Sequence, residues 1–430
     1  MPSIAPSPSA APEDAPRRAQ PAAASGNSGV AARGVHFPCF EGLRALASVM
    51  VVVHHASSLA GDARSAGFLH RPAAVMDSGV AVFFVISGFL IYRPYVASHL
   101  GGRPDIRARA FFWRRLLRLV PAYWMALTFF WYLGNFDLGG DWWRYYLFGQ
   151  IYSRNTALGG LVQAWSLCTE VTFYLMIPVW AALLRRVTAR VRGPGAGGGA
   201  PVVELAGCGL LYAFGFVVRQ VISARNPTWR GLSFQWLPTN VDLFAVGMAL
   251  AVVSAWTAAD GRLRARVDAL ARYGEAWWAA GIALFAWYAV RVGAPTLPML
   301  GDPNGAYRGS FWQQRQFVLG LVTALLLVPV AFGPQDRGPV RWVLRSRPVA
   351  WVGVISYGLY LWHFDWMKRV VERTNGFTGE VIWPGWLQTP AGDTNLVVLL
   401  LVGLGVGSIF AAVSWYLLER PAERFKSLVA

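Results

Sequence analysis

The chain has 430 residues, of which 55% are apolar, 14% are aromatic and only 14% are charged, and its mean hydropathy is +0.39. Soluble domains carry about 25% charged residues, so this composition excludes an ordinary soluble globular enzyme. The 39 Lys and Arg residues outnumber the 22 Asp and Glu residues, which gives a net charge of +17. In a soluble chain such an excess indicates nucleic-acid binding, but in an apolar chain it is typical of basic loops on the cytoplasmic side of a membrane. We therefore expect a membrane protein with no nucleic-acid partner.

The N-terminal segment and the cysteines each exclude further classes of protein. Residues 1–34 are mostly Ala, Pro, Ser and Gly, and a segment with so few large apolar residues cannot bury enough surface to fold. No apolar run follows the arginine pair at positions 17 and 18, so the segment is not a cleavable signal peptide. The cysteines are Cys39, Cys168 and Cys208. Their long, irregular spacings exclude a disulfide scaffold and a zinc ribbon, and we expect no metal site.

Long apolar runs separated by short loops rich in Arg, Pro and Gly fill the remainder of the chain. Ten of these runs have about the 20 residues that a helix needs to cross the hydrocarbon core of a bilayer. They are Phe37–Leu59, Ser78–Ser98, Arg118–Phe136, Ala164–Leu184, Val202–Ser223, Trp236–Trp256, Glu275–Val292, Arg315–Phe332, Val349–Val371 and Thr394–Leu418. The aromatic segment Trp142–Tyr152 is typical of an interfacial piece instead. We predict an all-α, polytopic membrane protein with about ten transmembrane helices in one bundle. This domain occupies residues 35–425, between a disordered cytoplasmic tail (1–34) and a short cytoplasmic tail (426–430).

The distribution of basic residues predicts the orientation of these helices. With ten spans, both termini lie on the same side of the membrane. The two tails and the loops after the second, fourth, sixth and eighth spans hold most of the 39 Lys and Arg residues. Short loops with such an excess face the cytoplasm. We therefore expect a multipass protein of the plasma membrane with both termini in the cytoplasm.

Two ionisable residues lie on one face of the first predicted helix. Arg44 and His55 are eleven residues apart, which is close to three helical turns and a rise of about 16 Å. His54 points away from that face. In one interpretation Arg44 reaches lipid headgroups and His55 is a satisfied buried histidine. In the other, both belong to a functional site, which is the default hypothesis for charges at membrane depth. The shared stripe favours the functional site.

Ionisable residues of three further spans fall at a depth similar to that of His55. They are Glu170, Asp242 and His363, each a few turns below the predicted outer surface. For Asp242, a packing or capping role is the stronger alternative. A histidine beside a carboxylate in a semi-buried layer can activate a hydroxyl group by acting as a general base.

Arginines gather on the predicted cytoplasmic side, in the run FFWRRLLR (Phe111–Arg118). A guanidinium binds two phosphate oxygens through its planar fork, although anchoring to lipid headgroups is a simpler role for the same residues. Together with the outer layer, these arginines indicate that a group passes from a phosphorylated cytoplasmic donor to an acceptor near the outer face. No Walker A, GxSxG or HExxH motif occurs where it could matter, so ATPase, serine-hydrolase and zinc-protease interpretations lack support.

Six stretches of the chain, in order, resemble the motifs of the acyltransferase 3 family of multipass membrane O-acyltransferases. They are FEGLRALASVMVVVHH (Phe40–His55), SGVAVFFVISGFLIYR (Ser78–Arg93), FFWRRLLRLVPAYW (Phe111–Trp124), AWSLCTEVTFYLMIPV (Ala164–Val179), ISYGLYLWHFDWM (Ile355–Met367) and YLLERPAERF (Tyr416–Phe425). The stretch PTNVDLFAVGMALA (Pro238–Ala251) is similar to a looser family motif. The resemblance extends from Phe37 to Phe425, so only the N-terminal tail lies outside it.

The resemblance implies a ten-helix domain that transfers an acyl group, commonly acetyl, from cytoplasmic acyl-CoA to a hydroxyl group. The acceptor would be a surface glycan, a glycolipid or a glycosylated metabolite such as a macrolide, and no tightly bound cofactor is implied. Some relatives carry an additional C-terminal hydrolase-like domain, which we do not expect here. By motif position, Arg44 and His55 match the essential pair of the family and Glu170 matches its acidic residue.

The resemblance also implies roles for these residues. We expect His55, oriented by Glu170, to deprotonate the acceptor, with an acyl-histidine intermediate left open. The phosphates of acyl-CoA would be held by Arg44, Arg114, Arg115 and Arg118. Supporting roles are expected for Glu41, Ser87, His363 and Asp242. The outer loops at 137–163 and 294–314 would shape the choice of acceptor. A transporter that uses the same polar layer is the main alternative, and a non-catalytic scaffold is another.

Overall fold

The computed structural model describes residues 37–60, 70–104, 106–192, 200–225, 230–293, 309–333, 335–374 and 395–429. The predicted disordered tail at 1–34 lies outside the described residues, and so does most of the predicted outer loop at 294–314. The chain from Phe37 onward forms one unit, and this unit is the one described below.

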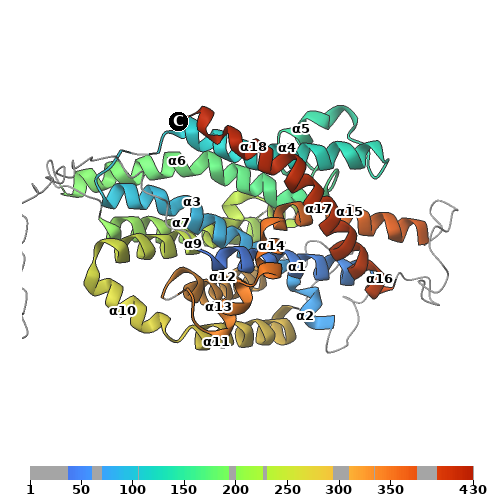
Figure 1. Cartoon of the computed structure of the whole chain (residues 1–430). Coiled ribbons are helices and arrows are strands. Elements are labelled where there is room, and N and C mark those ends of the chain that lie inside the picture. The colour runs from blue at the N-terminus through green and yellow to red at the C-terminus, as the bar shows by residue number, and fades with distance from the viewer. Residues whose placement is uncertain are drawn as a thin grey trace, which may run out of the picture. The chain divides into compact units, whose positions relative to one another are not determined.

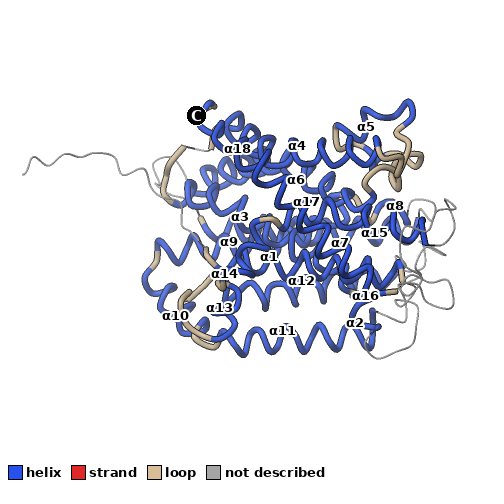
Figure 2. Tube along the Cα trace, turned by 45° about the vertical axis from the view of Figure 1, so that its right-hand side comes forward, coloured by secondary structure: helices blue, strands red, loops and turns tan. Residues whose placement is uncertain are grey.

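All regular secondary structure in the described residues is helical, and they contain no strand (Figures 1 and 2). The α-helices are α1 (Cys39–Leu59), α2 (His70–Ala74), α3 (Gly79–Leu100), α4 (Ala108–Tyr132), α5 (Trp142–Tyr146), α6 (Trp165–Arg192), α7 (Pro201–Arg225), α8 (Arg230–Ser233), α9 (Leu237–Ala259), α10 (Gly261–Ala271), α11 (Gly274–Tyr288), α12 (Gly309–Ala331), α13 (Pro339–Leu344), α14 (Arg347–Val354), α15 (Ser356–Thr374), α16 (Leu396–Leu400), α17 (Gly407–Ser414) and α18 (Arg420–Glu423). The short 3-10 and π segments are η2 (Met76–Ser78), η3 (Gly139–Asp141), η4 (Gln150–Tyr152), η5 (Val162–Ala164), η7 (Ala289–Gly293), η11 (Leu401–Val406), η12 (Trp415–Glu419) and η13 (Arg424–Leu428).

A helix lies at each of the ten predicted spans. Within the described ranges, seven helical segments are long and apolar enough to cross a membrane by length and composition alone. The predicted third, seventh and ninth spans, at α4, α11 and α15, fall outside these seven. The third span was predicted to begin at Arg118, whereas α4 begins ten residues earlier, at Ala108. The arginine cluster at 114–118 therefore lies on a helix and not in the loop before it.

Two further differences concern helix boundaries. The ninth predicted span is two helices, α14 and α15, which meet at Ile355. The predicted loop after the sixth span contains the basic helix α10, which begins where the carboxylate of Asp260 accepts hydrogen bonds from the backbone N–H groups of Arg262 and Leu263. The aromatic segment Trp142–Tyr152 forms only the short helices α5 and η4, so it does not span the membrane, as predicted.

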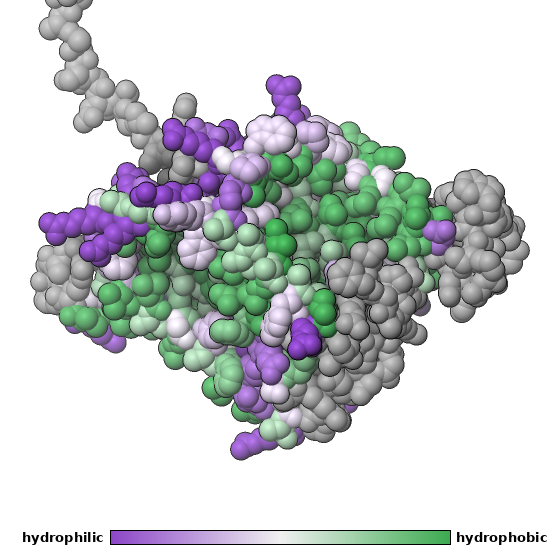
Figure 3. Space-filling view, turned by 90° about the horizontal axis from the view of Figure 1, so that it is seen from below, coloured by the Kyte–Doolittle hydropathy of each residue, from purple (hydrophilic) through white to green (hydrophobic). Residues whose placement is uncertain are grey.

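The long helices turn apolar side chains outward. Leu175 and Val179 on α6, Leu210 on α7 and Ile409 on α17 each expose between 60% and 70% of their surface. Figure 3 shows a broad apolar area on one face of the molecule, with hydrophilic residues mainly at the upper left of the view and along its lower edge. Helices satisfy their own backbone hydrogen bonds, so they can present such a surface to lipid. The chain is therefore a polytopic, all-α membrane protein.

Glycines bring α3 and α9 into close contact in the middle of the bundle. A Cβ atom on Gly88 would lie 2.2 Å from the carbonyl oxygen of Phe244, and one on Gly247 would lie 2.0 Å from that of Val85. Membrane helices without a strong hydrophobic drive between them often pack through small residues in this way. The crossing holds Ser87 of α3 next to the site described below.

Candidate active site

Helix α1 carries both Arg44 and His55. It is a continuous α-helix from Cys39 to Leu59, so the two residues keep the three-turn separation that the sequence predicts, about 16 Å along the axis. The helix packs against α3, α14 and α15. Each of the two residues faces a different polar group of the bundle.

His55 pairs with His363 of α15. The Nδ1 atom of His55 lies 2.8 Å from the Nε2 atom of His363, and the two rings stack at 5.1 Å with an angle of 25° between their planes. His363 is fully buried, and its own Nδ1 atom lies 2.9 Å from the carbonyl oxygen of Leu359.

This chain of hydrogen bonds fixes the tautomer of His55. A carbonyl oxygen only accepts, so the Nδ1 of His363 is the protonated donor and its Nε2 is the acceptor. The Nδ1–H of His55 then donates to that acceptor, which leaves the Nε2 of His55 with its lone pair available. An imidazole held in this form is ready to accept a proton from a hydroxyl group.

The neighbouring His54 has different surroundings. Its Nδ1 atom lies 3.3 Å from the carbonyl oxygen of Ala73, in α2. The ring of Phe364 packs against His55 at 4.7 Å. His55 therefore belongs to the histidine pair, and His54 belongs to the contact between α1 and α2.

Arg44, at the other end of the stripe, lines a cavity with two further arginines. Arg115 and Arg118 of α4 reach the same cavity, together with Ser87 and Glu170. Three guanidinium groups and one carboxylate leave an excess of positive charge, which suits an anionic ligand. We call this space the arginine cavity.

Glu170 is held in the arginine cavity by two hydroxyl groups. The Oγ of Ser87 and the phenol of Tyr174 each donate a hydrogen bond of 2.6 Å to its Oε1 atom. The guanidinium of Arg115 lies over the ring of Tyr174, 5.5 Å from the ring centre. Serine, tyrosine and arginine thus fix the carboxylate on the wall of the cavity.

His55 and Glu170, which the sequence predicts in one polar layer, lie in two separate polar groups of the structure. No hydrogen bond joins His55 to Glu170 in the described part of the chain. His363 is the residue bonded to His55, whereas Glu170 shares its cavity with Arg44, three turns away along α1. Helix ends follow from sequence only to within a few residues, so depth along separate helices does not determine which neighbour Glu170 faces.

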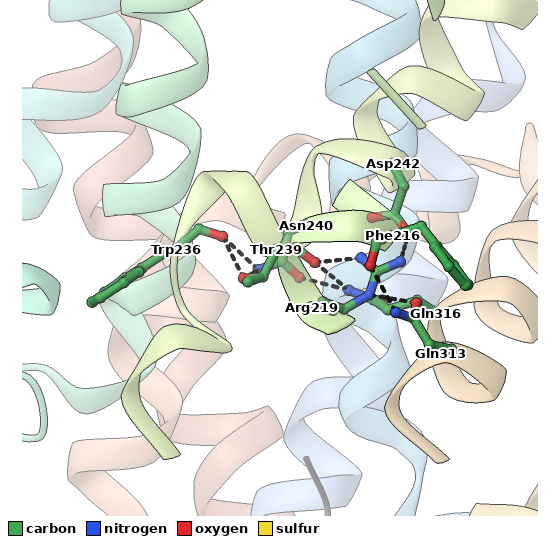
Figure 4. Close-up of polar contacts among 8 residues, drawn as sticks. All are labelled: Phe216, Arg219, Trp236, Thr239, Asn240, Asp242, Gln313 and Gln316. Carbon is green, nitrogen blue, oxygen red and sulfur yellow. Dashed lines mark hydrogen bonds and ion pairs between the residues drawn. The ribbon is translucent and has the colours of Figure 1, made fainter. Parts of the chain in front are cut away.

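The remaining predicted residues have separate positions. Glu41 is half-buried in the first turn of α1, and Arg114 is not among the residues that line the arginine cavity. Asp242 forms a buried ion pair of 2.8 Å with Arg219 of α7 (Figure 4). Only 2% of the Arg219 side chain is exposed.

Tyr360 connects the two polar groups. It lines the arginine cavity, and its ring lies 6.0 Å from that of His363, one turn further along α15. Its hydroxyl donates to the carbonyl oxygen of Gln163 and lies 2.8 Å from the Oγ of Ser166. The arginine cavity and the histidine pair are therefore neighbours inside the bundle.

Sequence reasoning missed Tyr174, Tyr360 and Arg219. The four-residue spacing from Glu170 to Tyr174 places both on one helix face and could have indicated their contact. The spacing from Tyr360 to His363 carries the same signal. In the described ranges, no three His, Cys, Asp or Glu side chains converge in a way that could hold a metal ion.

Fold and site together define a multipass membrane protein with a histidine pair and an arginine-lined cavity inside its bundle. Residues 37–418 match the family described as the acyltransferase domain, so the chain belongs to that family and is a membrane acyltransferase. No solved structure matches it.

Two of three relatives of the chain carry names that agree with this class. The chain is 25% identical to nodulation protein 10 of Rhizobium leguminosarum over 82% of its own length and 84% of the relative. It is 24% identical to the peptidoglycan O-acetyltransferase OatA of Listeria monocytogenes over 83% of its own length, and 26% identical to the O-acetyltransferase OatA of Staphylococcus aureus over 76%. It spans about half the length of these two O-acetyltransferases, 53% and 50% respectively.

Proposed function

We propose that the protein transfers an acetyl group from acetyl-CoA to a hydroxyl group of a surface glycan, a glycolipid or a glycosylated metabolite. Two relatives are named as O-acetyltransferases, one of them acting on peptidoglycan. These names support the acetyl group and a glycan acceptor for this chain.

The observation that carries the proposal is the pair of polar groups on one helix. α1 presents Arg44 to the arginine cavity and His55 to His363. An anion-binding group and a general base held about 16 Å apart suit a long phosphorylated donor whose reactive end is far from its charged end. Acyl-CoA is a donor of this shape.

The arginines bind the charged end of the donor. Arg44, Arg115 and Arg118 would contact the phosphates, because guanidinium groups form paired hydrogen bonds with phosphate oxygens. Glu170, fixed by Ser87 and Tyr174, offsets one of the three positive charges of the cavity before the donor enters. The thioester end then extends past Tyr360 toward the histidine pair.

The reaction is a direct transfer assisted by His55. The Nε2 atom of His55 takes the proton of the acceptor hydroxyl as its oxygen attacks the thioester carbonyl carbon. The carbon–sulfur bond breaks, and the departing CoA thiolate takes the proton back from His55. A base positioned in this way is worth about 10²–10⁴ in rate.

The same proposal includes the orientation of the protein. The plasma membrane is its location, and both termini lie in the cytoplasm, because basic loops prefer that side. Arg44 is then near the cytoplasmic face, where acyl-CoA is available, and His55 is nearer the outer face.

Proteoliposomes test the proposal. Release of CoA thiol from acetyl-CoA is measured with soluble peptidoglycan fragments or a glycolipid extract as acceptor, for the wild type, His55→Ala and His54→Ala. We expect His55→Ala to lose at least about 10²-fold in rate and His54→Ala to retain most of it. Mass spectrometry of glycans, lipids and secreted metabolites from cells with and without the protein identifies the acceptor by its acetyl mass.

The transporter alternative gives a different result. A transporter moves labelled substrate across sealed vesicles without consuming the thioester. Equal rates for His55→Ala and the wild type would exclude the mechanism proposed above.

A further inference from the structure

A second cavity lies between the N-terminal parts of α3, α6, α9 and α12. Its polar wall includes Asp77, Ser78, Asn240 and Gln316, and its aromatic wall includes Trp165 and Trp312. Indole rings beside carboxylate, amide and hydroxyl groups offer apolar faces and hydrogen-bond partners in one small space. We call this space the tryptophan cavity.

Two polar atoms of the tryptophan cavity have no hydrogen-bond partner within the described ranges. The Oγ of Ser78 and the Oδ1 of Asp77 are both buried and unpaired, and only 4% of Ser78 is exposed. The other carboxylate oxygen of Asp77 accepts a hydrogen bond of 2.6 Å from Arg315. Leaving a buried polar atom unpaired costs about 1–3 kcal/mol. A ligand that forms hydrogen bonds with these two atoms would recover that free energy.

The amide residues of the polar wall, Asn240 and Gln316, are connected to the ion pair of Arg219 and Asp242 through the backbone at Thr239. Arg219 donates to the carbonyl oxygen of Thr239 at 2.7 Å, and the amide of Gln316 donates to the same oxygen at 3.0 Å (Figure 4). Gln316 also donates to the Oδ1 of Asn240 at 3.1 Å.

A buried ion pair is expensive in a membrane and marks a functional region by default. Here the pair fixes the backbone at Thr239, and through it the two amide side chains on the cavity wall. The polar wall is therefore set in place before any ligand arrives.

The tryptophan cavity adjoins the arginine cavity but is separate from it. Phe84 lines both, and its ring stacks on Phe244 at 4.6 Å. These two phenylalanines form an aromatic partition between the cavities. α3, α6, α9 and α12 correspond to the second, fourth, sixth and eighth predicted spans, which all begin at the outer face in the proposed orientation. The tryptophan cavity is then nearer the outer face, on the side of the proposed acceptor.

We propose that the tryptophan cavity binds a pyranose ring. The hydroxyl groups of the ring would donate to Asp77 and Ser78, and its apolar face would pack on the indole groups of Trp165 and Trp312. That this ring is part of the acyl acceptor rests on the proposed function. The proposal that the cavity binds a pyranose ring does not depend on the proposed function.

Photo-crosslinking of the full chain in nanodiscs tests the proposal. The probe is a methyl hexopyranoside that carries a small diazirine, and labelled peptides are identified by mass spectrometry. We expect the label in the segments that contain Asp77 and Ser78 or Trp312 and Gln316. Methyl glucoside should compete for it, whereas tetrahydropyran-2-methanol, which has the same ring but one hydroxyl group, should not.

Matched serine variants measure the contribution of the unpaired hydroxyl. Ser78→Ala should weaken binding of the probe by about 3- to 10-fold. Ser57→Ala is the control, because Ser57 is 1% exposed, its hydroxyl also has no partner in the described residues, and it lines neither cavity. The crosslinking map of the wild type decides the question even if a variant does not fold.

Each outcome has a defined meaning. Label in the arginine cavity or on the lipid-facing surface, equal competition by the two competitors, or no label at all would overturn the proposal. Label in the tryptophan cavity without any release of CoA thiol would support ring binding and refute acyl transfer. Release of CoA thiol without this label would support acyl transfer and refute ring binding.

Discussion

The Nδ1 atom of His55 and the Nε2 atom of His363 lie 2.8 Å apart, although 308 residues separate them in the sequence. His363 is bonded in turn to the carbonyl oxygen of Leu359, so the proposed base is held by a second imidazole that is anchored to the backbone of its own helix. We therefore propose that His363 is a positioning residue for His55.

Replacing His363 should lower turnover without weakening donor binding. In His363→Phe the ring volume is kept but the acceptor for the Nδ1–H of His55 is lost, so kcat should fall by about 10²-fold or more. The KM for acetyl-CoA should stay within about twofold of the wild type, since a positioning role leaves donor affinity untouched. Steady-state kinetics in proteoliposomes measure both values. His363→Gln restores an acceptor oxygen and should recover part of kcat, and a lack of any recovery would contradict the positioning role.

The arginine cavity predicts a ranking among the arginines of α4. Arg118→Ala removes a guanidinium that lines the cavity, and loss of a charged hydrogen bond of about 1.5–3 kcal/mol should raise the KM for acetyl-CoA by about 10- to 100-fold. Arg114→Ala, four positions earlier and outside the cavity lining, should have a much smaller effect. Titration of the initial rate with acetyl-CoA distinguishes the two. Equal effects would indicate a general role of the cluster at the lipid headgroups.

Glu170→Gln tests whether the carboxylate acts in the arginine cavity or on the histidine pair. The amide oxygen can still accept from Ser87 and Tyr174, but the negative charge among the arginines is gone. We expect a changed KM for acetyl-CoA and a kcat within about tenfold of the wild type, a smaller loss than the range for a general base. A loss of kcat as large as that of His55→Ala, with unchanged KM, would instead favour orientation of His55 by Glu170.

The buried ion pair should matter more for stability than an exposed one. Asp242→Asn leaves the guanidinium of Arg219 buried without a counter-charge, which should lower the free energy of unfolding by about 3–5 kcal/mol. The control is Asp141→Asn, because Asp141 is 41% exposed and pairs with Arg144 at 2.9 Å. It should cost no more than about 1 kcal/mol. Denaturant titration in detergent micelles compares the two variants, and equal costs would refute the role assigned to Arg219.

The crossing of α3 and α9 predicts opposite effects for two glycine substitutions. In Gly88→Ala the new methyl group would lie 2.2 Å from the carbonyl oxygen of Phe244, so the helices must separate at a cost of about 1–3 kcal/mol. Gly209 in α7 has nothing within 4 Å of the corresponding position, and Gly209→Ala should stabilise the helix by up to about 1 kcal/mol. Thermal unfolding in micelles measures both. A Gly88→Ala variant as stable as the wild type would contradict the close crossing.

Hydropathy predicted where the long helices lie, because burial in lipid imposes a length and composition that the sequence carries directly. It did not predict where α4 begins or that α14 and α15 meet at Ile355. Those boundaries depend on contacts between distant segments, which hydropathy does not record. α10 was missed because a short arginine-rich segment between two spans resembles a loop in sequence. Asp260, directly before it, is nevertheless a typical helix N-cap.

Helical periodicity predicted correctly that Arg44 and His55 share one helix. It could not predict which neighbouring helix each would face, since the rotation of one helix against another is set by packing. Depth alone placed both Glu170 and His363 beside His55, whereas only His363 contacts it and Glu170 lines the arginine cavity. The partner of Asp242 was missed because Arg219 lies near the end of a span, where a basic residue is usually exposed.

The aromatic partition between the two cavities has a consequence for the cell. Phe84, Phe244 and Phe173 form a continuous stack, with ring centres 4.6 Å and 4.2 Å apart. Such a stack offers no hydrogen-bonded path for protons and no polar path for ions. Under the proposed function, in which an acyl group passes from a cytoplasmic donor to an outer acceptor, this stack would close the direct route between the two cavities to ions and protons.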